Sequence, residues 1–349
     1  MVEASAHLRN VQKNLLCGPD AQLAESEKGW HGICKHTGAP IIWTETIQSV
    51  PKRMKRAPVP RSTHQKPEAN SSAAADKMPF ILAHEFFDAL PIHAFQAVEA
   101  PVPKPPSDPS TTDLTPEAAE TPKPTLEWRE MVVTPTPTQP NLDPANPVAE
   151  FQLSLSDIPT RNAQYLAHFS PRLREFETTP GAIVEVCPDA ALYASEFATR
   201  IGGSPEHPVL KPAGAALILD YGTDEAPVNS LRGIRRHRRV SPFAEPGLVD
   251  LSADVDFTAV ARAAARASEH VEIHGTVQQA EFLGRMGGKE RAEMLMKAAG
   301  PERAKVIEEA YQRLVDQSPG GMGRLYKALA ILPENGGKRR PVGFGGDVP

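Results

Sequence analysis

The sequence predicts an α/β fold whose ligand site lies at the carboxyl ends of its strands. Two uncharged runs, at 80–83 and 214–219, have the apolar composition of strands that are buried on both faces of a sheet. Acidic residues follow both runs: Glu85 and Asp88 come after the first, and Asp220 comes directly after the second. Ligands of open α/β sheets bind at this edge, so we expect these carboxylates to contribute to a site.

Composition limits the class of protein. The chain has 349 residues, 40% of them hydrophobic, which is enough for a substantial core in one or two domains. The 38 basic and 43 acidic residues give a net charge of −5, which argues against a nucleic-acid-binding protein. No apolar run approaches the roughly 18 residues that are needed to span a bilayer. Three cysteines without a C-x-x-C pair argue against a zinc site, and we expect no metal.

Proline content suggests how the chain is organised. Thirteen prolines fall within 101–150, several times the ordinary frequency of roughly 5%. One strand, near 126–133, is expected within this region because apolar and polar residues alternate there. The predicted regions are a partial core at 1–96 with a loop at 52–78, a proline-rich insertion at 97–178, the rest of the core at 179–333, and a disordered tail at 334–349.

The first fifty residues contain candidate groups for a nucleotide-type ligand. A helix pattern at 6–16 follows a short extended segment that contains Glu3. In α/β nucleotide-binding folds, an acid at the end of such a strand accepts hydrogen bonds from a ribose diol. A second strand is predicted at 41–43 and runs on to Glu45. By residue type alone, Trp43 is a core tryptophan and Glu45 a solvated acid, and the resemblance described below gives the alternative that both are ligand neighbours.

The stretch His84–Pro91 reads His-Glu-Phe-Phe-Asp-Ala-Leu-Pro and places two acids three residues apart. Glu85 and Asp88 therefore either cap a following helix or form a functional site at the strand end. Asp220 and Tyr221 end the second apolar run, and sheet geometry predicts that they lie near Glu85.

The later part of the chain alternates strand and helix patterns. Asp256 precedes the helix at 257–268, and we expect it to cap that helix, which explains the aspartates at 250–256 without a metal. A strand within 181–190 leads into a helix from about 190 to 201, a further strand is predicted at 271–273, and further helices are predicted at 289–299 and 302–316.

Five arginines surround His237 between residues 230 and 242. By itself such a cluster indicates an anion site or a nucleic-acid surface. The acidic total argues against nucleic acid. The resemblance of this segment to the family described below implies instead a loop close to the active cleft.

The string at 84–91 closely resembles the signature of the mitochondrial complex I assembly methyltransferases, the MidA-like family. Further strings similar to family segments lie at 2–12, 183–190 and 246–257. The resemblance implies a class I, Rossmann-like methyltransferase sheet with inserted substrate elements. It also implies S-adenosylmethionine as methyl donor and, as acceptor, an arginine on a subunit of respiratory complex I in the mitochondrial matrix.

The resemblance assigns a role to each candidate residue. Expected catalytic residues are Glu85, which clamps the guanidinium group, with Asp88 as second acid and His84 as proton acceptor. Expected cofactor neighbours are Glu3, Trp43 and Glu45, and expected substrate neighbours are Asp220, Tyr221 and His237.

One departure from the family pattern concerns the start of the chain. No segment before Met1 supplies the family's first strand and glycine-rich loop, so we expect both to be missing, and no transit peptide is visible. Without that loop, the cleft for the methionine part of the donor is incomplete. The alternative is a non-catalytic complex I assembly or binding protein, or a truncated gene model that cannot bind the donor.

Overall fold

The computed structural model describes residues 1–50, 78–100, 125–137, 149–166, 172–236, 238–338 and 340–345. The chain divides into two compact units, 1–77 and 78–349, and each is described by itself. The predicted loop at 52–78 lies almost wholly outside the described residues, as do much of the proline-rich insertion and His237. No helix in the described part of the chain is long and apolar enough to cross a membrane.

The first unit combines one helix with a small antiparallel sheet. The predicted helix is confirmed as α1 (Ala6–Leu16), and the Ser5 hydroxyl accepts a hydrogen bond from the Leu8 N–H at its start. The strand expected at Glu3 is reduced to one parallel bridge between Val2 and Thr44. The sheet has the order β1 (Ala24–Ser26), β2 (Gly29–Ile33) and β3 (Pro40–Trp43), followed by the 3-10 helix η1 (Ile47–Ser49).

The second unit contains a mixed sheet with β9 (Ala215–Thr223) in its interior. Strand β4 (Phe80–His84) and the short β13 (Val255–Asp256) are parallel to β9 and pair with different parts of it. Strand β15 (Tyr326–Pro333) pairs with β9 in the antiparallel direction, and β14 (Val271–Gln278) pairs with β15. Both apolar runs are therefore adjacent parallel strands, and the pairing of His84 with Leu219 places their carboxyl ends together.

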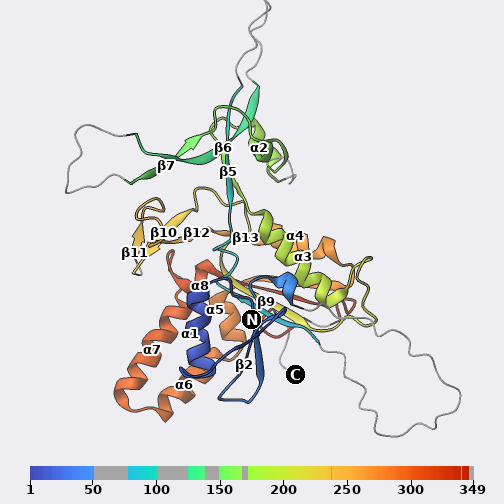
Figure 1. The fold of residues 1–349 in the computed structure, drawn as a ribbon, viewed down its shortest axis with the longest axis vertical. Helices are drawn as coiled ribbons and strands as arrows, with labels where there is room; N and C mark the ends of the chain where they lie inside the picture. Colours follow the sequence, from blue (N-terminus) through green and yellow to red (C-terminus); the bar gives the residue numbers. More distant parts are fainter. Residues whose placement is uncertain are drawn as a thin grey trace, which may run out of the picture. The chain divides into compact units, whose positions relative to one another are not determined.

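Helices pack against this sheet. Helices α3 (Pro188–Gly202) and α4 (Phe257–Ala267) lie side by side and contact β9, β14 and β15 (Figure 1). In β15, Ala328 and Ala330 pack in a cluster with Phe282 of α5 (Gln279–Arg285). The alternating Leu329 and Ile331 are fully buried and face the opposite side of the sheet. The remaining helices are α6 (Gly288–Ala298), α7 (Pro301–Val315) and α8 (Met322–Leu325).

The start of α4 confirms the expected cap. The Asp256 carboxylate accepts a hydrogen bond from the Ala259 N–H and is paired with Arg172. Among the described residues, no group of His, Cys, Asp and Glu side chains is arranged to hold a metal ion. Asp254, two residues before Asp256, is paired with Arg232.

A second, antiparallel sheet has the order β7-β6-β5-β8. The strand predicted near 126–133 is β6 (Leu126–Pro135), and the structure adds β5 (His93–Glu99) and β7 (Phe151–Leu155), which the sequence did not predict. Strand β8 (Ile183–Val186) leads into α3 as expected. The helices α2 (Arg161–Tyr165) and η2 (Arg174–Thr178) flank this sheet.

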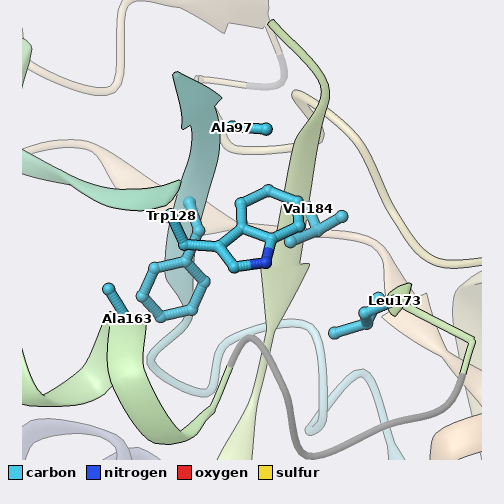
Figure 2. Packing of buried hydrophobic residues seen from close by; sticks show 6 residues of the cluster. Ala97, Trp128, Ala163, Leu173 and Val184 are labelled. Carbon is cyan, nitrogen blue, oxygen red and sulfur yellow. The ribbon is translucent and has the colours of Figure 1, made fainter. Parts of the chain in front are cut away.

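Trp128 of β6 is the largest side chain in the core of this second sheet. Figure 2 shows its indole ring between Ala163 of α2 and Val184 of β8, with Leu173 nearby. All four residues are buried. This core joins strands β5, β6 and β8, which are separated along the chain by the proline-rich segments.

The arginine cluster forms a third small sheet, which corrects the expectation of a loop. Strand β10 (Arg232–Arg235) pairs with β11 (Arg238–Val240) on one side and with β12 (Asp250–Ser252) on the other. Alternating residues of a strand point to opposite faces, so this sheet presents two different surfaces.

Candidate functional site

The backbone at the end of β4 is unusual. Glu85 has a φ of 47°, in the left-handed region that non-glycine residues occupy at a cost of roughly 1–3 kcal/mol. Its N–H donates to the Leu219 carbonyl at 3.0 Å, so this residue still follows the parallel pairing. The left-handed conformation then turns the chain, and the next N–H groups point towards β9.

Asp220 of β9 holds this turn. One carboxylate oxygen, Oδ2, accepts hydrogen bonds from the Phe86 N–H at 3.0 Å and the Phe87 N–H at 2.9 Å. The other accepts from the N–H of Tyr221 at 2.9 Å. The side chain is fully buried, so Asp220 faces backbone groups and not the substrate side on which it was expected.

Burial and the nearby Asp88 carboxylate raise the pKa of Asp220 to about 7, against the opposing effect of its N–H donors. The negative charge of Asp88 disfavours the ionised form of Asp220, as burial does. The Asp220 carboxyl is therefore much less acidic than an exposed aspartate.

Asp88 and Tyr221 lie next to the turn that Asp220 holds, and their side chains are hydrogen-bonded to each other. The Tyr221 hydroxyl donates to Asp88 Oδ2 at 2.6 Å and also contacts the Ser252 hydroxyl. The Arg232 guanidinium lies 4.3 Å from the centre of the Tyr221 ring, a cation–π arrangement. Burial, with the neighbouring Asp88, raises the pKa of Tyr221, so its phenol remains a donor. Asp88 Oδ1 is buried and has no hydrogen-bond partner among the described residues.

Glu85 is exposed, whereas Asp88 is half-buried and Asp220 is fully buried. The Tyr326 hydroxyl donates to Glu85 Oε1 at 2.8 Å, and the Tyr326 ring lies 5.3 Å from the Tyr221 ring. Burial raises the pKa of Tyr326, and the bond to Glu85 acts in the same direction. A carboxylate fixed beside aromatic rings is suited to bind an organic cation.

The residues on either side of Glu85 in the chain lie in different environments. His84 is exposed on β4 and lies on the opposite face of the strand from the buried Ala83. The centroid of the Phe86 ring lies 4.8 Å from that of Tyr193 of α3, and the centroid of the Phe87 ring lies 6.1 Å from that of Phe197 of α3. These phenylalanines therefore anchor the turn to α3.

Several members of the site could not be identified from the sequence alone. Tyr326 is far downstream of Glu85 and no local motif marks it. Arg232 sits in the stretch at 230–242 that was interpreted as a loop, and Ser252 lies outside that stretch, between the aspartates at 250–256. The structure brings Glu85, Asp88, Asp220 and Tyr221 together as predicted from sheet geometry.

The expected cofactor neighbours share one network in the first unit. Glu3 is half-buried and accepts hydrogen bonds from the Ser5 N–H at 2.9 Å and the Gln12 amide at 3.0 Å. The same Gln12 accepts the indole N–H of Trp43 at 2.9 Å. Trp43 is fully buried, which favours the core interpretation, whereas Glu45 is exposed.

Comparison with known proteins gives a family match over residues 1–277, to the family described as "Putative S-adenosyl-L-methionine-dependent methyltransferase". Three curated relatives carry the name "Protein arginine methyltransferase NDUFAF7, mitochondrial". The Danio rerio protein is 28% identical over 95% of this chain and 60% of its own length, and the Homo sapiens protein is 28% identical over 95% and 58%. The Mus musculus protein is 30% identical over 82% of this chain and 48% of its own length. The chain thus spans about half to three-fifths of the length of these relatives.

Among solved structures, a Burkholderia thailandensis protein bound to S-adenosyl-homocysteine is 20% identical, with a TM-score of 0.45, over 74% of this chain and 55% of that protein.

Proposed function

The chain belongs to this S-adenosyl-L-methionine-dependent methyltransferase family, and from that premise we propose that it methylates an arginine side chain of a protein. The curated relatives are named as arginine methyltransferases and as mitochondrial, which supports the substrate class and the compartment. We further propose the mitochondrial matrix as the location and a subunit of respiratory complex I as the protein substrate. For the fold, we propose that the parallel strands belong to a class I, Rossmann-like sheet.

The exposed carboxylate of Glu85, held by Tyr326 at the strand ends, carries this proposal. Arginine remains protonated because its pKa exceeds about 12. A fixed carboxylate binds such a cation through charge-assisted hydrogen bonds, and these bonds orient the remaining guanidinium nitrogen towards the methyl group. Because transfer is an in-line displacement, this positioning dominates the rate.

The other residues support Glu85 in different ways. Asp88 supplies the second negative charge, while Asp220 acts as a positioning residue, because its bonds to Phe86 and Phe87 keep the turn in place. Tyr221 orients Asp88. We assign His84 to accept the proton released by the methylated guanidinium, and His237, outside the described residues, to the substrate side.

The first unit contains a group that fits the methyl donor. Glu3 uses one hydrogen bond on each oxygen, and a carboxylate has about four acceptor positions, so it can also accept from a ribose diol. Glu45 is an exposed acid of the same unit and is paired with Arg9, and the buried Trp43 supports Glu3 through Gln12. When bound, S-adenosylmethionine would supply an electrophilic methyl group.

The proposal is tested with Glu85→Gln in the full chain. Purified complex I subunits are incubated with tritiated S-adenosylmethionine, and the modified arginine is located by mass spectrometry. We expect at least about a 100-fold loss of transfer, with unchanged donor affinity in calorimetry, because Glu85 contacts the acceptor only. The control is Glu308→Gln, an exposed acid of α7. An unaltered rate in Glu85→Gln would remove this residue from the mechanism, and no donor binding by the native chain would favour a non-catalytic role.

A further inference from the structure

An apolar pocket lies between the second sheet and the small sheet of β10, β11 and β12. It encloses about 310 Å³, and its lining includes Val133, Phe151, Leu231, Phe243, Val249 and Leu251. That volume is at the lower end of the roughly 300–1,000 Å³ found for ligand sites. Its size therefore suits one or two side chains of a peptide. The chemistry at Glu85 makes no use of this pocket.

The pocket and the acidic site lie on opposite faces of the same two strands. Leu231 lines the pocket, while the next residue, Arg232, lies over the Tyr221 ring. Leu251 lines the pocket in the same way, while Ser252 contacts the Tyr221 hydroxyl. The register agrees, because Arg232 pairs with Ser252 across the strands. One strand thickness therefore separates the pocket from the site.

The sheet beside the pocket carries an excess of positive charge. Residues 231–254 contain five arginines and three carboxylates, Glu245, Asp250 and Asp254, an excess of two positive charges in a chain whose net charge is −5. Arg232 is paired with Asp254. Arg235 is paired with Glu245, whereas Arg238 and Arg239 are exposed on β11. A peptide segment that occupies the pocket and runs along the paired strands β10 and β11 (the β10–β11 hairpin) is therefore expected to bind more tightly when it is acidic.

We propose that the pocket binds an apolar side chain of the protein substrate, a few residues from the target arginine, in a segment whose acidic residues face Arg238 and Arg239. This inference rests on the proposed function, because it assigns the substrate's second anchor. The apolar anchor supplies affinity, and the hairpin selects the charge of the neighbouring residues. The acidic site then receives an arginine from a segment that is already held in place.

The test uses the full chain and fluorescent 13-residue peptides with a central arginine in a glycine–serine background. A leucine is moved through each of the six positions on either side, with or without two neighbouring glutamates, and binding is followed by anisotropy without methyl donor. We expect at least one leucine position to bind about tenfold more tightly than its serine counterpart. Val133→Glu should remove this gain, and it should be tolerated because Val133 is 58% exposed.

Three further variants complete the design. Leu251→Asn should also remove the leucine gain, and the double change Arg238→Glu, Arg239→Glu should weaken only the peptides that carry glutamates. The control Val228→Glu alters an exposed apolar residue outside the pocket and should leave binding unchanged.

Several outcomes overturn the inference: no leucine position is favoured, Val228→Glu is as damaging as Val133→Glu, or the native chain dimerises through the pocket in sedimentation. This binding assay is independent of the transfer assay described above. Leucine-dependent binding together with no methyl transfer in that assay would refute the proposed function and leave the pocket assigned. Methyl transfer without any leucine preference would refute the pocket and leave the proposed function standing.

Discussion

Replacement of Asp220 by asparagine should change how the stability of the protein depends on pH. The carboxyl has an ordinary pKa of 3.8, and in the fold burial and Asp88 raise the pKa to about 7. Between these values the folded protein retains a proton that the unfolded chain has released. The stability that Asp220 contributes is therefore complete below about pH 4 and is lost as the pH rises to about 7.

The size of the effect follows from the shift. A difference of about three pKa units, at about 1.4 kcal/mol each, corresponds to roughly 4 kcal/mol. Asparagine does not titrate, so the native protein should lose this amount relative to Asp220→Asn between pH 4 and pH 7. A constant offset is also expected, because one acceptor is lost and a buried N–H left unpaired costs about 1–3 kcal/mol.

The measurement is urea unfolding of both proteins at pH 4, 5.5, 7 and 8, with the free energies subtracted at each pH. The other carboxyl groups are common to both proteins and cancel to first order, and Glu308→Gln serves as an exposed control. A difference that stays constant within about 0.5 kcal/mol over this range would refute the reasoning. It would mean that Asp220 stays ionised throughout and that its backbone N–H donors outweigh burial.

Two further changes test separate parts of the molecule. Tyr326→Phe removes the donor that fixes Glu85 at 2.8 Å and should lower methyl transfer about tenfold with unchanged donor affinity in calorimetry; an equal rate would show that this hydroxyl does not position Glu85. Glu130→Gln tests the second sheet, where burial acts to raise the pKa of Glu130 but hydrogen bonds from Thr160, His93 and Asn162 lower it overall. The Glu130→Gln variant should melt at a lower temperature than the native protein at pH 7. Calorimetry should show this difference in melting temperature vanishing as the pH falls from about 4.5 through the lower pKa of the folded state. A difference in melting temperature that is independent of pH would contradict this account.

Local sequence determined the strands and helix ends on which the site depends. The uncharged runs became the paired parallel strands β4 and β9, but the expected burial on both faces is wrong for β4, where Phe80 is 76% and Leu82 is 68% exposed. Ser5 and Asp256 each stand before a helix and cap it, because their short side chains reach the free N–H groups of the first turn. Glu85 follows the end of β4 (Phe80–His84) as the sequence predicts, whereas Asp220 lies inside β9 (Ala215–Thr223) and not after it.

The tertiary structure alone decided the environment of each acid. Glu85 and Asp220 look alike in the sequence, since each follows an uncharged apolar run, yet Glu85 is exposed and Asp220 is fully buried. The register of β4 on β9 and the left-handed turn at Glu85 make this difference. Tyr326 reaches Glu85 because β15 pairs with β9 in the antiparallel direction, with Tyr326 opposite Tyr221. Strand order and register depend on contacts between residues far apart in the chain, and no local pattern encodes them.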